Sequence, residues 1–104
     1  MITDISTLTK ISEARVVTES GSSYLRKLCQ HWAHKFPVRY DDEHGKIDLV
    51  AGKCLLFADT AGLTVRLMMP EDGEEARLQQ VVEEHIKRFA FRETLEFAWS
   101  SATG

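Results

Sequence analysis

Hydrophobic residues in the first third of the chain recur at three- and four-residue spacings. Drawn as a helix, they fall on one stripe, which covers about 140° of the surface. The stripe consists of Leu25, Leu28, Cys29, Trp32, Ala33 and Phe36. This pattern predicts an amphipathic helix over residues 20–36, with Ser20 or Ser22 as its N-cap. Pro37 should end the helix, because the residue before a proline is pushed toward extended geometry.

Alternating apolar and polar residues predict six strands. Their expected ranges are 12–18, 38–41, 46–50, 53–59, 63–69 and 94–100. The turn at 42–45 ends in Gly45, which is free to take a positive φ. Only short turns separate the four middle strands, and this spacing predicts an antiparallel meander.

A second amphipathic helix is predicted over residues 73–89. Its apolar stripe consists of Leu78, Val81, Val82, Ile86 and Phe89. Asp72 and Glu75 have the spacing of a capping box. The helix also offers two favourable (i, i+4) ion pairs, Glu83–Lys87 and Glu84–Arg88.

The expected element order is therefore β-α-β-β-β-β-α-β in a single domain spanning residues 1–104. Residues 1–11 are interpreted as an N-terminal arm, 12–100 as the core, and 101–104 as a polar tail. Two amphipathic helices need a common surface on which to bury their stripes. We therefore expect an α+β two-layer sandwich, a curved antiparallel sheet with both helices on one face. This order is similar to TATA-binding-protein-like and helix-grip arrangements.

Composition narrows the class of protein. The chain has 104 residues, 43% of them hydrophobic, and a net charge of −3. A negative charge argues against a nucleic-acid partner. Cys29 and Cys54 are far apart and are interpreted as buried thiols in a reducing compartment. Residues 1–10 lack the apolar core of a signal peptide, and no apolar run reaches bilayer length, so we expect a soluble cytoplasmic protein without a membrane partner.

Three histidines are candidates for chemistry. His31 and His34 share the polar side of the first helix, where they are either solvated surface or weak candidates for half of a metal site. His85 falls in the middle of the second apolar stripe. It is either a core histidine bonded to a carbonyl, or the centre of a pocket between helix and sheet, where it would bind a ligand or act as a general base.

The outer face of the predicted sheet carries charges of both signs, on Arg39, Asp48, Arg66 and Glu96. Such alternation favours cross-strand ion pairs on a solvated face. The alternative is that another chain covers this face.

Four segments carry a family resemblance: YLRKLCQHWAHKFPV at 24–38, GKIDL at 45–49, GKCLL at 52–56 and HIKRFAFRETLEFAW at 85–99. Over residues 12–100 the chain resembles a small bacterial family known as domain of unknown function twenty-two eighteen. Domains of that family are joined in some longer chains to siderophore-interacting flavin reductases, which implies a context of iron acquisition. The recurrent polar positions that the resemblance implies are His31, His34, Lys35, Asp48, Cys54, His85, Arg88, Arg92 and Glu93.

These observations favour a non-catalytic binding or accessory module, linked to siderophore or iron handling, with no cofactor of its own. Expected partners are a second copy of the chain and a flavin-dependent siderophore reductase. The expected ligand-binding residues are His85, Arg88, Arg92, Cys54 and Trp99. One alternative is a small enzyme with a His85-centred pocket and His85 as its catalytic residue. The other is a metal- or haem-binding protein that uses His31 and His34.

Overall fold

A computed structural model describes residues 8–103 of the chain and confirms the predicted order of elements. Six strands and two helices alternate as expected. Their bounds are β1 Lys10–Val17, α1 Gly21–Trp32, β2 Val38–Tyr40, β3 His44–Leu49, β4 Gly52–Ala58, β5 Gly62–Met69, α2 Glu75–Phe89 and β6 Ala98–Thr103. Among these residues, no helix is both long enough and apolar enough to cross a membrane.

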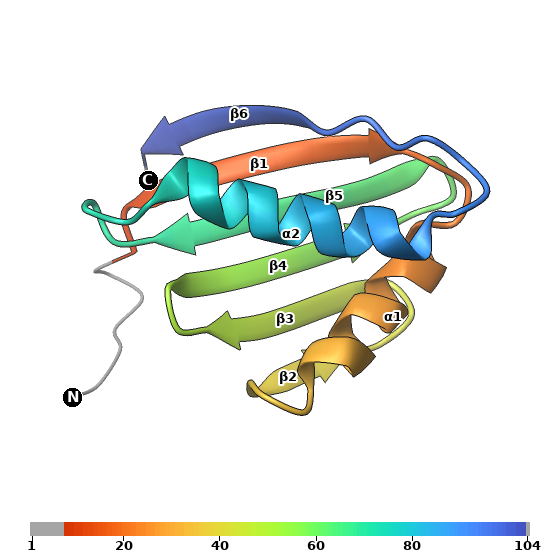
Figure 1. Ribbon diagram of the computed structural model, residues 1–104, viewed down its shortest axis with the longest axis horizontal. Coiled ribbons are helices and arrows are strands. Elements are labelled where there is room, and N and C mark those ends of the chain that lie inside the picture. The colour runs from red at the N-terminus through yellow and green to blue at the C-terminus, as the bar shows by residue number, and fades with distance from the viewer. Residues whose placement is uncertain (1–7, 104) are drawn as a thin grey trace.

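The strands form one antiparallel sheet in the order β2-β3-β4-β5-β1-β6 (Figure 1). The meander β2 to β5 matches the prediction. Strand β1 then pairs with β5 on one side, where Ala14 lies opposite Val65, and with β6 on the other. The first and last strands of the chain are thus neighbours, although the rest of the domain separates them in sequence.

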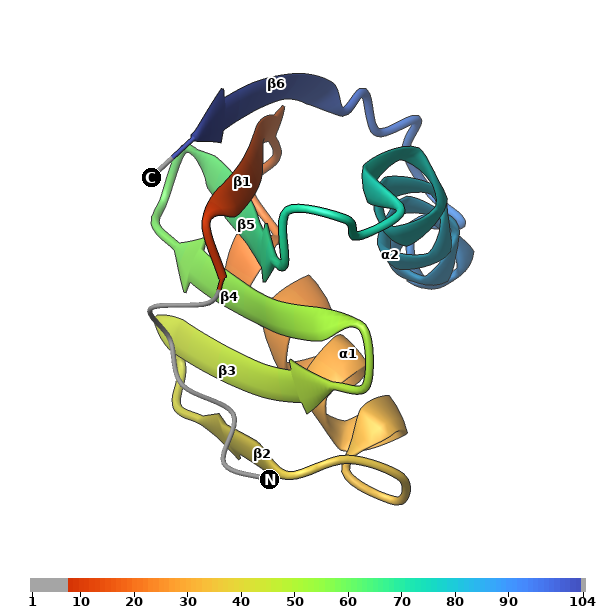
Figure 2. The same ribbon diagram turned by 90° about the vertical axis from the view of Figure 1, so that its left-hand side faces the viewer.

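Both helices cover the same face of the curved sheet (Figure 2). Helix α1 contacts strands β2 to β5, and α2 contacts β5 and α1. The core lies between the two layers. Its fully buried members include Leu25 and Leu28 of α1, Leu56 and Val65 of the sheet, and Ile86 of α2. No helix or strand of residues 8–103 covers the other face of the sheet, which is called the uncovered face.

Both helices are shorter than predicted. Helix α1 ends at Trp32, four residues early, and the Trp32 carbonyl accepts the amides of Lys35 and Phe36 in a closing turn. Phe36 precedes Pro37 and is disfavoured in helical geometry, so a further regular turn does not form. Ser20 is the N-cap but makes no side-chain cap hydrogen bond.

The predicted capping box of α2 was wrong. The helix begins at Glu75 with Glu74 as N-cap and no side-chain cap bond, so Asp72 lies outside it. Of the two predicted ion pairs on this helix, Glu83–Lys87 forms at 2.7 Å, whereas Glu84 and Arg88 do not pair.

Gly45 does not serve the turn for which it was predicted. It lies inside β3, is buried, and has no positive φ. The turn instead rests on Asp41, whose Oδ1 accepts the amides of Glu43 and His44 at 2.8 and 2.7 Å. A Cβ at position 45 would lie 3.0 Å from Sγ of Cys29, so glycine is needed because helix α1 packs closely there.

The last strand is displaced toward the C-terminus. It begins at Ala98 rather than Thr94, and residues 101–103, interpreted as a polar tail, belong to it. The reason is pairing with β1. Arg15 of β1 lies opposite Ala98, and Lys10 lies opposite Thr103, so the paired stretch runs from residue 98 to residue 103. At the other end, residues 1–7 of the predicted arm lie outside the described residues, and residues 10 and 11 belong to β1.

Candidate functional site

Two adjoining hollows lie between α1 and the C-terminal end of α2, and together they are called the helix groove. They measure about 420 and 260 Å³. Both are lined by Lys27, Phe89 and Phe91. The first is completed by Gln30, His31 and Arg88, the second by Ser20, Ser23, Tyr24, Arg92 and Glu93. The groove therefore joins residues of two segments that are about sixty positions apart in the chain.

The charges in the helix groove are mostly positive. Lys27, Arg88 and Arg92 form no ion pair with any carboxylate of the described residues. The Arg92 guanidinium lies 5.5 Å from the centre of the Phe91 ring, which is 79% exposed. Three cations without an ion-pair partner among the described residues, beside exposed aromatic surface, can attract an anion with an apolar body, since cations bind carboxylate or phosphate oxygens and aromatic rings stack on one another.

Glu93 is the one carboxylate that lines the groove, and its carboxylate already accepts two hydrogen bonds within the protein. Its Oε2 accepts hydrogen bonds from the Tyr24 hydroxyl at 2.5 Å and from the Thr18 hydroxyl at 2.9 Å. Burial, together with this carboxylate, raises the pKa of Tyr24 to about 12. Glu93 thus ties the segment after α2 to the start of α1, and this contact holds the two sides of the groove together.

His85 lies against α1 rather than facing the sheet. Its ring centre is 5.0 Å from that of Trp32 and 5.4 Å from that of His31. Its Nδ1 hydrogen-bonds the Val81 carbonyl one turn earlier, at 2.7 Å. The residue is half-buried and lines neither hollow of the groove. The catalytic hypothesis for His85 stays a prediction, with the ring positioned by backbone and helix packing.

The remaining sequence candidates lie elsewhere. Cys54 is fully buried in the core, and burial raises its pKa far above the usual value for a thiol. Trp99 stacks on Phe97 and donates its indole N–H to Glu83 at 2.8 Å. Of the five expected ligand-binding residues, Arg88 and Arg92 therefore reach the groove, His85 lies beside it, and the other two are structural.

The weak metal candidates do not gain further ligands in the described part of the chain. His31 and His34 are both exposed. Among residues 8–103, no group of three or more histidine, cysteine or acidic side chains is arranged to hold a metal ion. A metal- or haem-binding role for this pair would have to draw ligands from outside these residues.

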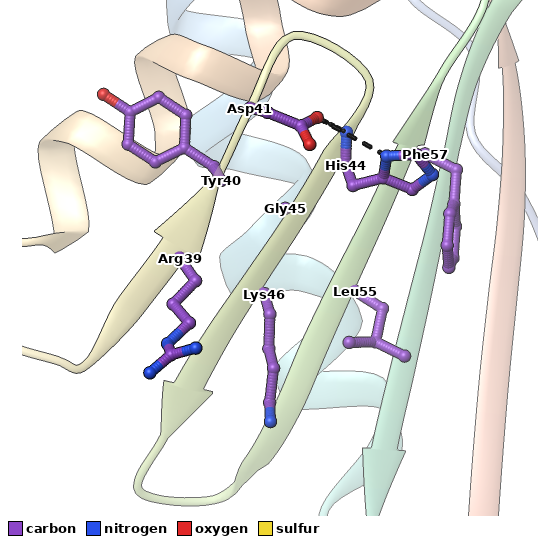
Figure 3. A pocket seen from close by; sticks show the side chains of 8 residues that line it. All are labelled: Arg39, Tyr40, Asp41, His44, Gly45, Lys46, Leu55 and Phe57. Carbon is purple, nitrogen blue, oxygen red and sulfur yellow. Dashed lines mark hydrogen bonds and ion pairs between the residues drawn. The ribbon is translucent and has the colours of Figure 1, made fainter.

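A further hollow of about 480 Å³, called the sheet hollow, lies on the uncovered face of the sheet (Figure 3). Its lining residues come from β2, β3 and β4 and the turn between β2 and β3. They are Arg39, Tyr40, Asp41, His44, Gly45, Lys46, Leu55 and Phe57. Sequence reasoning placed Arg39 on this face but did not connect it with Lys46 or Phe57. The alternation of β3 and β4 was the signal that puts these side chains on one face.

The predicted ion pairs of the sheet face form in part. Arg66 pairs with Glu13 at 2.8 Å, and Asp48 pairs with Lys53 at 3.2 Å. Arg39 has no ion-pair partner among the described residues. The placement of Glu96 on this face was wrong, because β6 begins only at Ala98. Cross-strand pairing therefore accounts for most of this face but not for its β2–β3 corner.

The fold is that of an α+β domain with one antiparallel sheet and two helices on one of its faces, and its surface carries the helix groove and the sheet hollow. The chain belongs to the family described as an uncharacterised protein conserved in bacteria (DUF2218), which matches residues 13–100. It is similar to the NMR structure of PA4090 from Pseudomonas aeruginosa, with 39% sequence identity and a TM-score of 0.72. That match covers 86% of this chain and 94% of the other. A comparison with curated proteins finds no match.

Proposed function

We propose that the protein is a non-catalytic binding module whose helix groove takes a negatively charged ligand with a flat aromatic part. The carrying observation is that Lys27, Arg88 and Arg92 surround Phe89 and Phe91 without any acidic partner among the described residues. Unpaired like charges brought together at a surface are unfavourable by themselves, and an anion removes that cost.

The positions implied by the family resemblance support the same site. His31, Arg88, Arg92 and Glu93 come from two separate motifs, and all four line the groove. His85 packs against His31 at its border. A site assembled from both motifs gives a physical reason for the two to occur in one family.

The ligand class that we propose within the iron-acquisition context is a ferric catecholate siderophore. Such complexes carry net negative charge and present aromatic rings, which matches the cations and phenylalanines of the groove. The module would then act as an accessory to a flavin-dependent siderophore reductase, either as a separate partner or through a second copy of itself. This link rests on the family resemblance and on the charge of the groove.

Fluorescence titration tests the ligand class, because Trp32 lies near the groove behind His85. An anionic ferric catecholate should quench the emission saturably, and a neutral ferric hydroxamate should bind much more weakly. The double variant R88Q/R92Q should lose about tenfold in affinity, which corresponds to about 1.4 kcal/mol. The control R26Q/R77Q changes the net charge equally, one residue on each helix, but lies outside the groove.

Two results would count against this function. If R88Q/R92Q and R26Q/R77Q weaken binding equally, the effect is one of net charge and the groove is not the site. If neither class of ferric complex binds, and a purified siderophore reductase does not bind either, the iron-related role is wrong. Binding of a simple aromatic carboxylate at the groove would then preserve the binding module with another ligand.

A further inference from the structure

The uncovered face of the sheet obeys a pairing rule with one exception. Three of its basic side chains each form an ion pair with an acidic neighbour, and such opposite-charge pairs stabilise a solvated sheet face. The pairs are Arg15–Asp59 at 2.9 Å, Lys53–Asp48 at 3.2 Å and Arg66–Glu13 at 2.8 Å. The exception is the corner where β2 meets β3.

At that corner two cations face each other. Arg39 of β2 and Lys46 of β3 are directly opposite in the strand register. Neither forms an ion pair with a carboxylate of the described residues. Directly opposed side chains have Cβ atoms about 4.5–5.5 Å apart, and like charges at that spacing are destabilising. Within residues 8–103 the pair therefore lacks the acidic neighbour that each other basic side chain of this face has.

Apolar surface lies directly beside the two cations. Leu55 is opposite Lys46 on the next strand, and Phe57 follows on the same face of β4 (Figure 3). The Phe57 ring lies edge-on to the His44 ring, with 6.0 Å between the ring centres, and the Arg66 guanidinium carbon lies 5.7 Å from the centre of the Phe57 ring. Leu55 and Phe57 together make an apolar floor beside the Arg39–Lys46 pair.

The one carboxylate that lines the hollow does not neutralise this site. Asp41 lines the hollow, but its Oδ1 accepts the amides of Glu43 and His44, and these backbone hydrogen bonds hold the pKa of Asp41 below its usual value. Its charge is engaged in the turn, at the opposite end of the hollow from Arg39 and Lys46 (Figure 3). The hollow is thus divided into an apolar floor, a turn, and a free cationic corner.

We propose that the sheet hollow is a second binding site, for a small aromatic carboxylate. The carboxylate lies between Arg39 and Lys46, where the planar guanidinium fork can take both oxygens, and the ring rests on Leu55 and Phe57. A volume of about 480 Å³ is within the usual range for small-ligand sites. The helices cover the other face of the sheet, so this site is separate from the helix groove and independent of it (Figure 2).

Amide chemical-shift mapping by NMR with three probes tests this site. Benzoate carries both the charge and the ring, benzyl alcohol only the ring, and acetate only the charge. Benzoate should shift the amides of Arg39, Lys46 and Leu55 saturably, and either other probe should bind at least about tenfold more weakly. The benzoate affinity should fall at high ionic strength, because the cations are exposed.

Substitution of the two cations provides the second arm. R39Q/K46Q should weaken benzoate binding by about tenfold while melting no lower than the wild type, since it removes a like-charge pair. The matched control R15Q/K53Q removes two cations from the same face that already have acidic partners, and it should bind benzoate as the wild type does. Each double variant changes the net charge by the same amount.

The outcomes separate this proposal from the function proposed for the helix groove. Benzoate shifts confined to the helix groove, unchanged binding by R39Q/K46Q, or equal binding of benzyl alcohol would each overturn the sheet site. Shifts in β2 to β4 that disappear in R39Q/K46Q but persist in R88Q/R92Q establish it, even if no ligand is found for the groove.

Discussion

Replacing Gly45 by alanine should destabilise the protein, because helix α1 lies directly over the β3 backbone at this position. An added Cβ would lie 3.0 Å from Cys29 Sγ and 3.3 Å from Leu25 Cδ2 and Leu56 Cδ1. All three neighbours are fully buried, so none can move away into solvent. A methyl group must therefore either displace α1 or force a core side chain away from its preferred rotamer.

Two opposing terms set the size of the effect. Inserting a methyl group into a well-packed core costs about 1–3 kcal/mol. Removing the excess conformational freedom of a glycine within a strand returns about 0.5–1 kcal/mol. The expected net loss in the free energy of unfolding is about 1–2 kcal/mol, and each kcal/mol should lower the melting temperature by about 4–8 °C.

A double-mutant cycle identifies the cause. C29A removes the closest atom and, by itself, should cost about 1 kcal/mol for the small cavity that it leaves. In that background G45A should cost at least about 1 kcal/mol less than in the wild type. C54A is the matched control, because it removes another buried sulfur that is not among the atoms nearest to position 45.

Urea unfolding followed by tryptophan fluorescence supplies the four free energies of each cycle. Coupling between Gly45 and Cys29, with none between Gly45 and Cys54, supports the close-packing argument. If G45A and C29A are simply additive, the glycine is not required by the approach of α1. If G45A is neutral or stabilising in the wild type, the core has room for the methyl group and the reasoning fails.

Two further predictions concern ionisation. The Glu83 pKa is raised by burial but lowered more by hydrogen bonds from Lys87 and Trp99, so it lies below its usual 4.5. The ionised Glu83 therefore stabilises the fold above the unfolded pKa, and this stabilisation is lost as pH falls through the folded pKa. In urea melts, E83Q should lower the free energy of unfolding at neutral pH by up to about 1 kcal/mol, and it should reduce the further loss of stability below pH 4.5. Burial raises the pKa of Cys29 to about 11 and that of Cys54 still further. A thiol reagent should react with neither cysteine in the folded protein and with both in denaturant, and rapid labelling of the native protein would contradict the buried positions of both.

Much of the fold follows from local pattern. The stripe through Leu25 and Leu28 is the buried side of α1, and the alternation around Val65 and Leu67 is the buried side of β5. These periods report which side of an element is apolar, and an apolar side must be covered. The order of elements, the single sheet and the placement of both helices on one face were therefore predictable.

Element ends and glycines were less predictable because they depend on partners. The start of β6 at Ala98 is set by where β1 can pair with it, and the need for glycine at position 45 is set by a helix from another part of the chain. Asp72 and Glu75 have the spacing of a capping box, yet the helix begins two residues too late to use it. In each case the local sequence favours one boundary or conformation, and tertiary packing determines which one forms.

The candidate sites show the same division. Arg88 and Arg92 were singled out from the sequence, but Lys27 and Phe91 became part of a site only when α1 and the end of α2 came together. His85 was placed correctly on the inner part of α2, yet its ring meets α1 and not the sheet.

The sequence by itself determined the elements, their apolar sides and the family. It also showed that Glu84 is the one acidic residue three or four positions away from Arg88. Only the tertiary structure decided that Lys27 joins Arg88 and that Arg39 faces Lys46. The physical reason is range. Hydrogen-bond geometry and side-chain periodicity act over a few residues and can be read along the chain, whereas the meeting of charges from distant segments depends on strand register and helix packing, which the whole core determines at once.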